Sequence, residues 1–293
     1  MSLLVIIILL ARSLSFTLSY DMSKTLFDYH NHTYLCGHAT GTAEEYVVAA
    51  IRLGLAEIGI SDHIPMYWLP EDKRDPTIAM SEDKLESYVD TVLSLKSVYP
   101  EITIRLGIEA DYIPGSEEKL ERLLEQYPWD YVYGSVHFID DWGFDNPEYA
   151  HRYEEWDLLE LYKKYFEIIA SAAKSQLFDI IGHIDVIKKW GHEPLESPIE
   201  LYKHVADVIA ESGLAVELNT AGYRKPVGKL YPSGDLLREL VSREVDFVLG
   251  SDSHQPSEVG YRLEDAISEA KAYGAIRLVG FSQRRKFSMG QVE

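Results

Sequence analysis

The sequence contains a single cysteine, Cys36, among its 293 residues, so no disulfide can form within the chain. Chains without disulfides are typical of reducing compartments, and we expect a cytoplasmic protein. Cys36 lies between His32 and His38. A thiol at that position could serve as a metal ligand, but we interpret it as a small residue in a tight loop.

Basic residues are also few: 28 lysines and arginines stand against 48 aspartates and glutamates, which gives a formal net charge of -20. Binding to a nucleic acid backbone depends on many lysines and arginines that displace its counterions, so this composition excludes a long nucleic acid partner. A small phosphorylated metabolite remains possible, because it needs only a local cluster of positive charge or bound metal ions.

The chain lacks a hydrophobic run long enough to cross a bilayer. The apolar run from Ser2 to Ala11 is about half of the ~20 residues that a membrane-spanning helix requires, so we expect no stable membrane association. The run resembles the core of a signal peptide but has no basic segment before it. We therefore predict that Met22 is the natural start, that residues 1–21 are an upstream extension, and that residues 22–293 form one domain. The oligomeric state cannot be read from the sequence.

Short apolar runs alternate with longer amphipathic segments throughout the rest of the chain. Buried strands joined by helices are typical of a parallel sheet, and seven or eight such units without a linker predict an α/β barrel closed on itself. Thr42 followed by Glu45 predicts a capping box, and Ser81 and Ser257 are expected to begin helices. The polar residues Ser282–Glu293 are expected to form a solvated tail. The expected strands are Leu26–His30, Leu55–Ser61, Ile102–Glu109, Tyr131–His137, Phe178–His183, Leu214–Asn219, Val245–Ser251 and Ile276–Phe281. The expected helices are 42–53, 81–99, 116–126, 157–175, 197–212, 233–243 and 257–273.

Potential metal ligands lie at or just beyond the carboxyl ends of these strands. A lone His-x-His, such as His30 and His32, is weak evidence, and a histidine at a strand end is more often a core residue than a ligand. Here, however, seven of the ten histidines follow strand ends, and these ends meet at one face of a barrel. His151, His192 and His204 fall outside the pattern. The candidate ligands are His30, His32, His38, His63, Glu109, His137, His183, Asp252 and His254.

So many ligands exceed the four to six that one ion takes, so more than one divalent ion is expected, with Glu109 as the candidate carboxylate to bridge two ions. Imidazole and carboxylate without thiolate favour zinc, manganese or iron. Clustered divalent ions lower the pKa of a bridging water and hold phosphoryl oxygens, so they could supply a hydroxide for phosphate ester hydrolysis.

The ordered ligand set resembles the PHP (polymerase and histidinol phosphatase) superfamily over about Leu26 to Phe281, and this resemblance implies a distorted (β/α)7 barrel. It also implies a division of the ligands in the members with three ions. The first ion would bind His30, His32, Glu109 and Asp252. The second, bridged by Glu109, would bind His137 and His183, and the third would bind His38, His63 and His254.

Three further stretches are similar to the stand-alone histidinol-phosphate phosphatases of that superfamily: 134–145, 182–189 and 219–226. They carry Lys188, Lys189, Arg224 and Lys225, which we predict as phosphate ligands because they follow strand ends in an otherwise acidic protein. The alternative for each lysine is an ordinary surface residue. Substrate contacts are also possible for Asp145, Trp142, Phe144, Tyr67 and Trp68, although such aromatics more often pack a loop against the barrel rim.

This resemblance implies hydrolysis of a phosphate monoester, L-histidinol phosphate, to L-histidinol and phosphate. Beyond metal binding, Asp252 is expected to orient the nucleophile and His254 to protonate the leaving alkoxide. Two alternatives remain open at this point. One is a phosphoesterase for another small metabolite, a nucleotide or phosphotyrosine, and the other is a metal-binding scaffold without catalytic activity.

Overall fold

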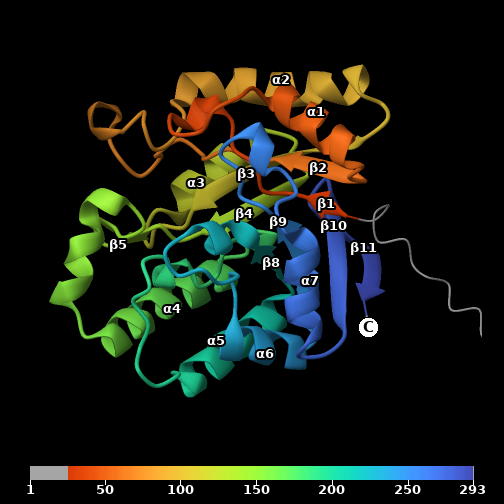
Figure 1. Ribbon diagram of the computed structural model, residues 1–293. Coiled ribbons are helices and arrows are strands. Elements are labelled where there is room, and N and C mark those ends of the chain that lie inside the picture. The colour runs from red at the N-terminus through yellow and green to blue at the C-terminus, as the bar shows by residue number, and fades with distance from the viewer. Residues whose placement is uncertain (1–25, 293) are drawn as a thin grey trace, which may run out of the picture.

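Strands and helices alternate along the chain in the computed structural model, which describes residues 26–292 (Figure 1). The predicted alternation is confirmed, whereas the predicted extension 1–21 and the start at Met22 lie outside the described residues. The strands are β1 Phe27–Asp28, β2 Glu57–Ile60, β3 Thr103–Asp111, β4 Tyr131–Ser135, β5 Phe138–Ile139, β6 Trp142–Gly143, β7 Ile180–Ile181, β8 Ala215–Asn219, β9 Asp246–Gly250, β10 Ile276–Ser282 and β11 Arg285–Val292. The α-helices are α1 Ala43–Leu53, α2 Leu85–Val98, α3 Glu117–Leu124, α4 Leu158–Lys174, α5 Ile199–Ser212, α6 Gly234–Ser242 and α7 Leu263–Lys271.

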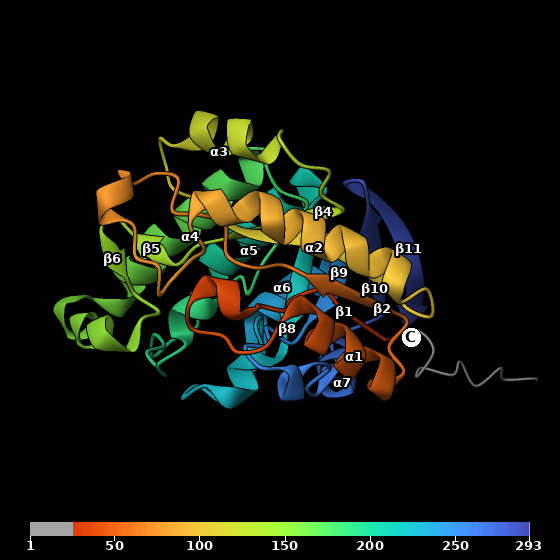
Figure 2. The same cartoon turned by 90° about the horizontal axis from the view of Figure 1, so that it is seen from above.

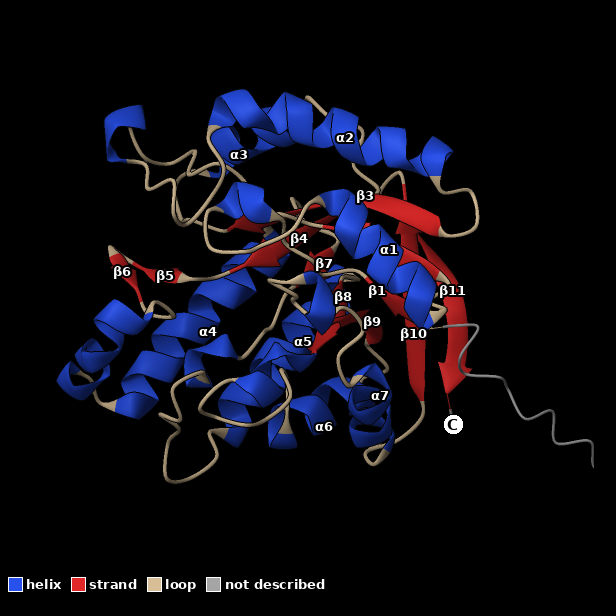
Figure 3. Cartoon of the chain, turned by 45° about the horizontal axis from the view of Figure 1, so that its top comes forward, coloured by secondary structure: helices blue, strands red, loops and turns tan. Residues whose placement is uncertain are grey.

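Seven of these strands form a distorted (β/α)7 barrel, as predicted. Neighbours pair in parallel in the order β1-β2-β3-β4-β7-β8-β9, and the helices surround them (Figure 3). The first half of β9 pairs with β10, at Asp246 and Phe247. Its far end turns to β1, where the Tyr29 N–H donates to the Leu249 carbonyl at 2.9 Å. β9 therefore closes the ring and also carries the outer hairpin.

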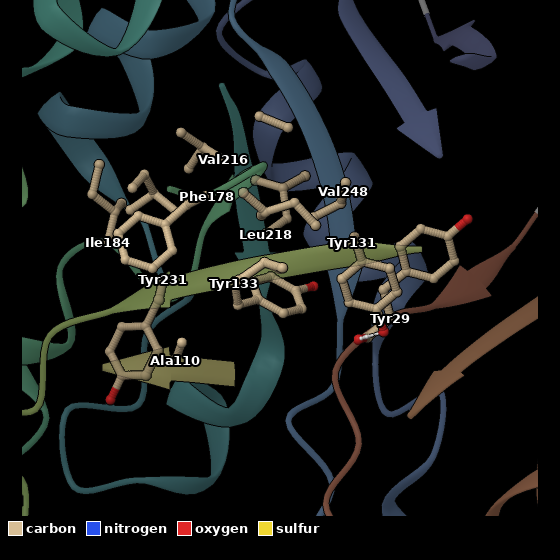
Figure 4. Close-up of a cluster of buried hydrophobic side chains, with 14 of the residues drawn as sticks. Tyr29, Ala110, Tyr131, Tyr133, Phe178, Ile184, Val216, Leu218, Tyr231 and Val248 are labelled. Carbon is tan, nitrogen blue, oxygen red and sulfur yellow. Dashed lines mark hydrogen bonds between the residues drawn. The ribbon is translucent and has the colours of Figure 1, made fainter. Parts of the chain in front are cut away.

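Aromatic rings fill the interior of the barrel (Figure 4). Tyr131 stacks on Tyr29 with ring centroids 4.9 Å apart, and its hydroxyl donates to the Tyr29 carbonyl. The Tyr131 side chain occupies the space of two missing side chains, because a Cβ on Gly59 would lie 1.9 Å from its hydroxyl oxygen and a Cβ on Gly107 would lie 2.3 Å from its ring. Neighbouring strands thus pack on one ring, in the dense manner of protein interiors.

Of the helix starts predicted at Thr42, Ser81 and Ser257, the first was confirmed and the other two were wrong. The capping box at Thr42 and Glu45 forms with both of its hydrogen bonds. Ser81 does not cap α2, which begins at Leu85 after a single 3-10 turn, and α7 begins at Leu263 rather than near Ser257. Within residues 26–292, none of the helices is long and apolar enough to cross a membrane.

The prediction of a solvated tail after Ser282 was wrong, because this segment forms β11 and pairs antiparallel with β10. Phe287 fixes the hairpin by packing on Gly280 and beneath the guanidinium of Arg105, whose central carbon lies 5.2 Å from the ring. Viewed from above, the hairpin lies at the side of the barrel opposite β5 and β6 (Figure 2). Two basic residues of the segment form ion pairs: Arg284 with Asp179 and Lys286 with Asp246.

The long connection between β4 and α4 is ordered around aromatic residues. It contains the β5–β6 ribbon and a 3-10 helix, Pro147–Glu155. Trp142 and Phe144 are buried, and Trp142 packs edge-on against Tyr153 at 4.9 Å. The more conservative interpretation holds for these two residues, because they pack the loop against the barrel rim.

Candidate metal centre

His30 and His32 lie just beyond β1 and are fully buried. Their Nε2 atoms both approach Asp252, whose Oδ1 lies 4.0 Å from His30 and 3.2 Å from His32. The same two nitrogens lie 3.4 and 3.5 Å from Oε2 of Glu109. The structure thus brings together, in one buried group, the four residues predicted for the first ion.

Glu109, at the carboxyl end of β3, faces a second group with its other oxygen. Oε1 lies 2.8 Å from Nε2 of His183 and 3.6 Å from Nε2 of His137, and the two imidazole nitrogens are 3.2 Å apart. The Glu109 carboxylate therefore stands between two sets of histidines, in the arrangement expected of a bridging ligand.

A third group consists of His38, His63 and His254, which have ligand atoms within 4.8 Å of one another. Nδ1 of His38 lies 3.0 Å from the Thr77 carbonyl, and Nδ1 of His254 lies 3.1 Å from the Asp252 carbonyl. Carbonyl oxygens only accept hydrogen bonds, so both Nδ1 atoms carry the proton and both Nε2 atoms keep a free lone pair for a metal ion.

Several donor atoms of the centre lack partners of their own. Within residues 26–292, Nε2 of His30, both ring nitrogens of His32 and Oε2 of Glu109 are buried without any hydrogen bond. Unpaired buried polar atoms are costly unless a ligand satisfies them. Imidazole nitrogens and carboxylate oxygens suit divalent zinc, manganese or iron, so the residues present fit the expected ions.

Burial and neighbouring charge set the protonation of the centre. Burial opposes the charged form of His30, but Glu217, Glu109 and Asp252 raise its pKa well above its ordinary value. His254 has no comparable surplus of carboxylates. Burial and the charge of His32 lower the pKa of His254 well below the usual range. A neutral imidazole near pH 7 favours metal binding over the proton-donor role predicted for His254.

Glu217, in the middle of β8, holds two of the ligand histidines in place. Its carboxylate lies 2.7 Å from Nδ1 of His30 and accepts the backbone N–H of His183 at 2.8 Å. Space for it comes from Gly250, where a Cβ would lie 1.9 Å from the carboxylate. Carboxylates that orient metal-bound histidines in this way raise metal affinity. The sequence interpretation missed Glu217, although a charged residue inside the apolar run 215–218 was the available signal.

Two further aspartates act on ligands in the same way. Asp111 accepts from Nδ1 of His137 at 2.9 Å, if this nitrogen carries the proton. Asp62 accepts the Thr33 N–H at 3.0 Å and fixes the turn that follows His32. Asp111 was also missed. Its position two residues after Glu109 places both side chains on the same side of β3, which is the signal that could have revealed it.

Asp252 has a strained backbone, with φ of 52°, a value that L-residues other than glycine rarely adopt. Arg224 holds this segment because one of its terminal nitrogens, Nη2, donates to the Ser251 carbonyl at 2.8 Å and the Asp252 carbonyl at 3.1 Å. Its other terminal nitrogen, Nη1, is buried without a partner. The structure thus places Arg224 beside the centre with donor capacity to spare.

The three predicted lysines differ from one another. Lys188 is buried and donates to Asp185, to the Leu230 carbonyl and to Ser233, which uses all three of its N–H groups. Its prediction as a phosphate ligand was therefore wrong, because its ammonium group is fully occupied inside the protein.

Lys189 and Lys225 retain some capacity to bind an anion. Lys189 donates to the carbonyl and carboxylate of Asp145 at 2.8 and 3.2 Å. The ammonium group of Lys225 makes no hydrogen bond or ion pair within residues 26–292. Burial and the nearby charge of Lys189 lower its pKa. Of the histidines outside the set, His151 and His204 are exposed, and His192 stacks on Tyr153 at 4.6 Å.

Known proteins match this chain along most of its length. Residues 28–221 match the PHP domain family. A protein named "Probable histidinol-phosphatase" from Deinococcus radiodurans is 45% identical over 262 residues, which cover 89% of this chain and 98% of that protein. The histidinol-phosphatase of Bacillus subtilis is 30% identical over 81% of this chain and 96% of its own length.

Among solved structures, a histidinol phosphate phosphatase from Lactococcus lactis, crystallised with zinc, L-histidinol and phosphate, has a similar fold. The TM-score is 0.76 at 21% identity, and the match covers 89% of this chain and 98% of that one. At this identity the match supports the barrel fold.

Proposed function

Because the chain belongs to the PHP domain family, we infer that it is a metal-dependent phosphatase that hydrolyses L-histidinol phosphate to L-histidinol and phosphate. Relatives with this activity in their names match nearly their whole length, at up to 45% identity. The structural observation that carries the proposal is the ring of buried donor atoms without partners around Glu109, which fits divalent ions at the open end of the barrel.

We assign the ions to the three groups described above, as two or three zinc, manganese or iron ions. His30, His32, Glu109 and Asp252 would hold the first, Glu109 with His137 and His183 the second, and His38, His63 and His254 the third. Bound divalent ions would lower the pKa of a coordinated water and neutralise charge on the phosphoryl oxygens.

Arg224 and Lys225 bind the phosphate in this proposal. The unpartnered Nη1 of Arg224 can donate to a phosphate oxygen while Nη2 stays on the Ser251 and Asp252 carbonyls. Such charge-assisted hydrogen bonds are about twice as strong as neutral ones. Lys225 adds an ammonium group without a hydrogen-bond partner in the described chain, and Lys189 can join it by leaving Asp145.

Asp252 orients the attacking water in this proposal, because its carboxylate stands among the His30 and His32 nitrogens and its second oxygen receives the Asn219 amide at 3.3 Å. Because its imidazole is neutral, His254 acts mainly as a metal ligand rather than as a proton donor. Any proton that it passes to the leaving alkoxide must first reach its ring from solvent.

A substrate panel tests the function. Protein loaded separately with manganese, zinc or iron is assayed on L-histidinol phosphate, an aryl phosphate, phosphotyrosine and a nucleoside monophosphate. We expect kcat/KM on L-histidinol phosphate to exceed the others by at least about 100-fold, because specific polar contacts discriminate by this amount or more. Equal rates on the aryl phosphate would overturn the substrate, and bound metal without hydrolysis of any ester would leave only a scaffold.

The cellular role follows from the reaction. We propose that the enzyme acts in the cytoplasm, in histidine biosynthesis, on this small phosphorylated metabolite and without a nucleic acid partner. Expression of the chain in a histidine auxotroph that lacks its own histidinol-phosphatase should restore growth without histidine. The Glu109→Gln variant, produced at the same level, should not restore it.

A further inference from the structure

Cys36 is the one feature of the centre that the proposed reaction does not use. It ends a 3-10 turn, Tyr34–Cys36, which starts at Thr33 and is followed by Gly37. Gly37 has φ of 85° and lies so close to Pro76 that a Cβ would stand 2.1 Å from the Pro76 carbonyl oxygen. The turn is therefore fixed from outside, and the Cys36 side chain is held inside the protein with no exposed surface.

The thiol lies beside two of the candidate ligands. Sγ of Cys36 and one ring nitrogen each from His32 and His254 lie within 4.8 Å of one another. A tetrahedral ion with metal–sulfur and metal–nitrogen bonds of ordinary length needs donors roughly 3.5 Å apart, so side-chain shifts of about 1 Å would complete the set. His32 is fully buried, and both of its ring nitrogens lack a hydrogen-bond partner.

We propose that Cys36, His32 and His254 form a binding site for a soft, thiophilic cation such as cadmium(II). A thiolate with two imidazoles prefers soft ions, whereas the three groups assigned to the phosphatase contain only nitrogen and oxygen donors. On binding, the S–H bond of Cys36 is replaced by a sulfur–cadmium bond, and the proton leaves to solvent.

This site overlaps two of the proposed catalytic groups. His32 belongs to the first group and His254 to the third, so a soft ion here withdraws one ligand from each. Bound cadmium therefore inhibits the enzyme by a route that differs from simple replacement of the resident ions. Only this consequence, and not the binding itself, rests on the proposed phosphatase function.

Spectroscopy tests the binding directly. Metal-free protein is titrated with cadmium(II), and thiolate-to-cadmium charge transfer is followed by ultraviolet difference absorption. Since Cys36 is the only cysteine of the chain, any such band reports this residue. We expect a band that saturates at one ion per chain. Saturable cadmium binding without the band would overturn the proposal.

Two variants separate the site from a fold defect. Cys36→Ser keeps the size of the side chain and should abolish the band. His254→Ala keeps the thiol and should weaken cadmium binding at the band by at least about 10-fold, the loss typical of a removed ligand interaction. His204→Ala, which removes an exposed histidine of α5, should leave the titration unchanged. A band of full strength and unchanged affinity in His254→Ala would overturn the proposed ligand set.

Turnover provides the last measurement. With manganese-loaded enzyme, the cadmium concentration that halves the rate should rise at least about 10-fold in Cys36→Ser, while the rate without cadmium stays the same. Equal inhibition of both proteins would overturn the inhibitory role. If neither protein hydrolysed any ester, the proposed function would fail, whereas the absorption titration would still decide the cadmium site.

Discussion

Both ends of the barrel carry carboxylates on the strands, but the partners of these carboxylates differ between the two ends. At the amino ends, each carboxylate meets a basic partner: Glu57 with Arg105, Asp130 with Lys96, Asp179 with Arg284, and Asp246 with both Arg277 and Lys286. At the carboxyl ends, Glu109 and Asp252 meet only histidines as ionisable partners within 4 Å.

This difference shows which end needs something from outside the chain. At the amino end the charges of these carboxylates are neutralised, because each of them has an arginine or lysine within 4 Å. The carboxyl end keeps buried donor atoms without partners. The same barrel thus uses one end for stability and the other for binding, as is general for barrels of parallel strands.

Metal removal should have the largest effect, and only on the carboxyl end. After dialysis against a chelator, hydrolysis of the substrate should fall to background. The unfolding temperature should fall by roughly 10 °C, because an ion at about 1,000 times its Kd adds about 4 kcal/mol of stability. Calorimetry with and without restored metal checks both effects. An unchanged unfolding temperature would mean that the unpaired donor atoms of the carboxyl end do not destabilise the metal-free protein. That result would contradict the proposed difference between the two ends.

Glu109→Gln comes next, because it removes the charge that lies within 4 Å of five candidate ligands: His30, His32, His63, His137 and His183. We expect kcat to fall by about 10²- to 10³-fold, the loss seen when one stabilising group is deleted from an active site. Metal content, measured by elemental analysis, should drop by at least one ion per chain. A variant with full metal content and normal kcat would show that Glu109 does not bridge two ions.

Arg224→Ala tests the unused guanidinium nitrogen at the carboxyl end. Loss of a hydrogen bond to a charged group costs about 1.5–3 kcal/mol, so kcat/KM should fall roughly 10- to 100-fold. Arg262 is a matched control, because it is an exposed arginine on the same side that pairs with Asp265. Steady-state kinetics of Arg262→Ala should stay within about twofold of the wild type, and similar losses in both variants would contradict the phosphate-binding role.

A pair of identical changes compares the two ends directly. Glu217→Gln should weaken metal binding about 10- to 100-fold, since it deprives His30 of its orienting carboxylate. Glu57→Gln alters a buried glutamate at the amino end and should leave metal affinity unchanged while lowering stability by about 1–3 kcal/mol. Competition with a metal indicator and denaturant unfolding measure the two quantities. Equal metal affinities of the two variants would erase the distinction between the ends.

Arg284→Ala should have the smallest effect. It breaks the pair with Asp179 and the hydrogen bond to the Leu177 carbonyl at 2.7 Å, and we expect a loss of about 1–2 kcal/mol in the free energy of unfolding. Activity and metal content should not change. Thermal unfolding measures the loss, and no loss at all would show that the Arg284–Asp179 pair contributes nothing to the stability of the amino end.

The barrel and the positions of its histidines could be predicted because both depend on local patterns. Apolar runs predicted strands, and a ligand directly after a strand, such as His183 after β7, shares its end with all the others. Thr42 and Glu45 specify a capping box within four residues, and that prediction was confirmed. Features that depend on residues close together in the chain can therefore be predicted from the sequence.

The errors arise where the outcome depends on contacts across the fold. Lys188 looks like any basic residue near a strand end, but its three acceptors include Leu230 and Ser233, more than forty positions away. β11 is polar in composition, and its partner β10 together with Phe287 makes it a strand. The charge inside an apolar run marks Glu217 as unusual, but its role becomes clear only when His30, from the other end of the chain, is known to lie beside it.

The closure of the ring between β1 and β9 has a consequence for the order of events in folding. Asp28 accepts hydrogen bonds from the backbone and side chain of Ser251, 223 positions later in the chain. Contacts of such long range form late, because the entropy of closing a large loop must be overcome first. During synthesis β1 therefore stays without its β9 neighbour until residues 246–254 have emerged from the ribosome. The ion-binding centre can be completed only after His254, the last of its candidate ligands, has been synthesised.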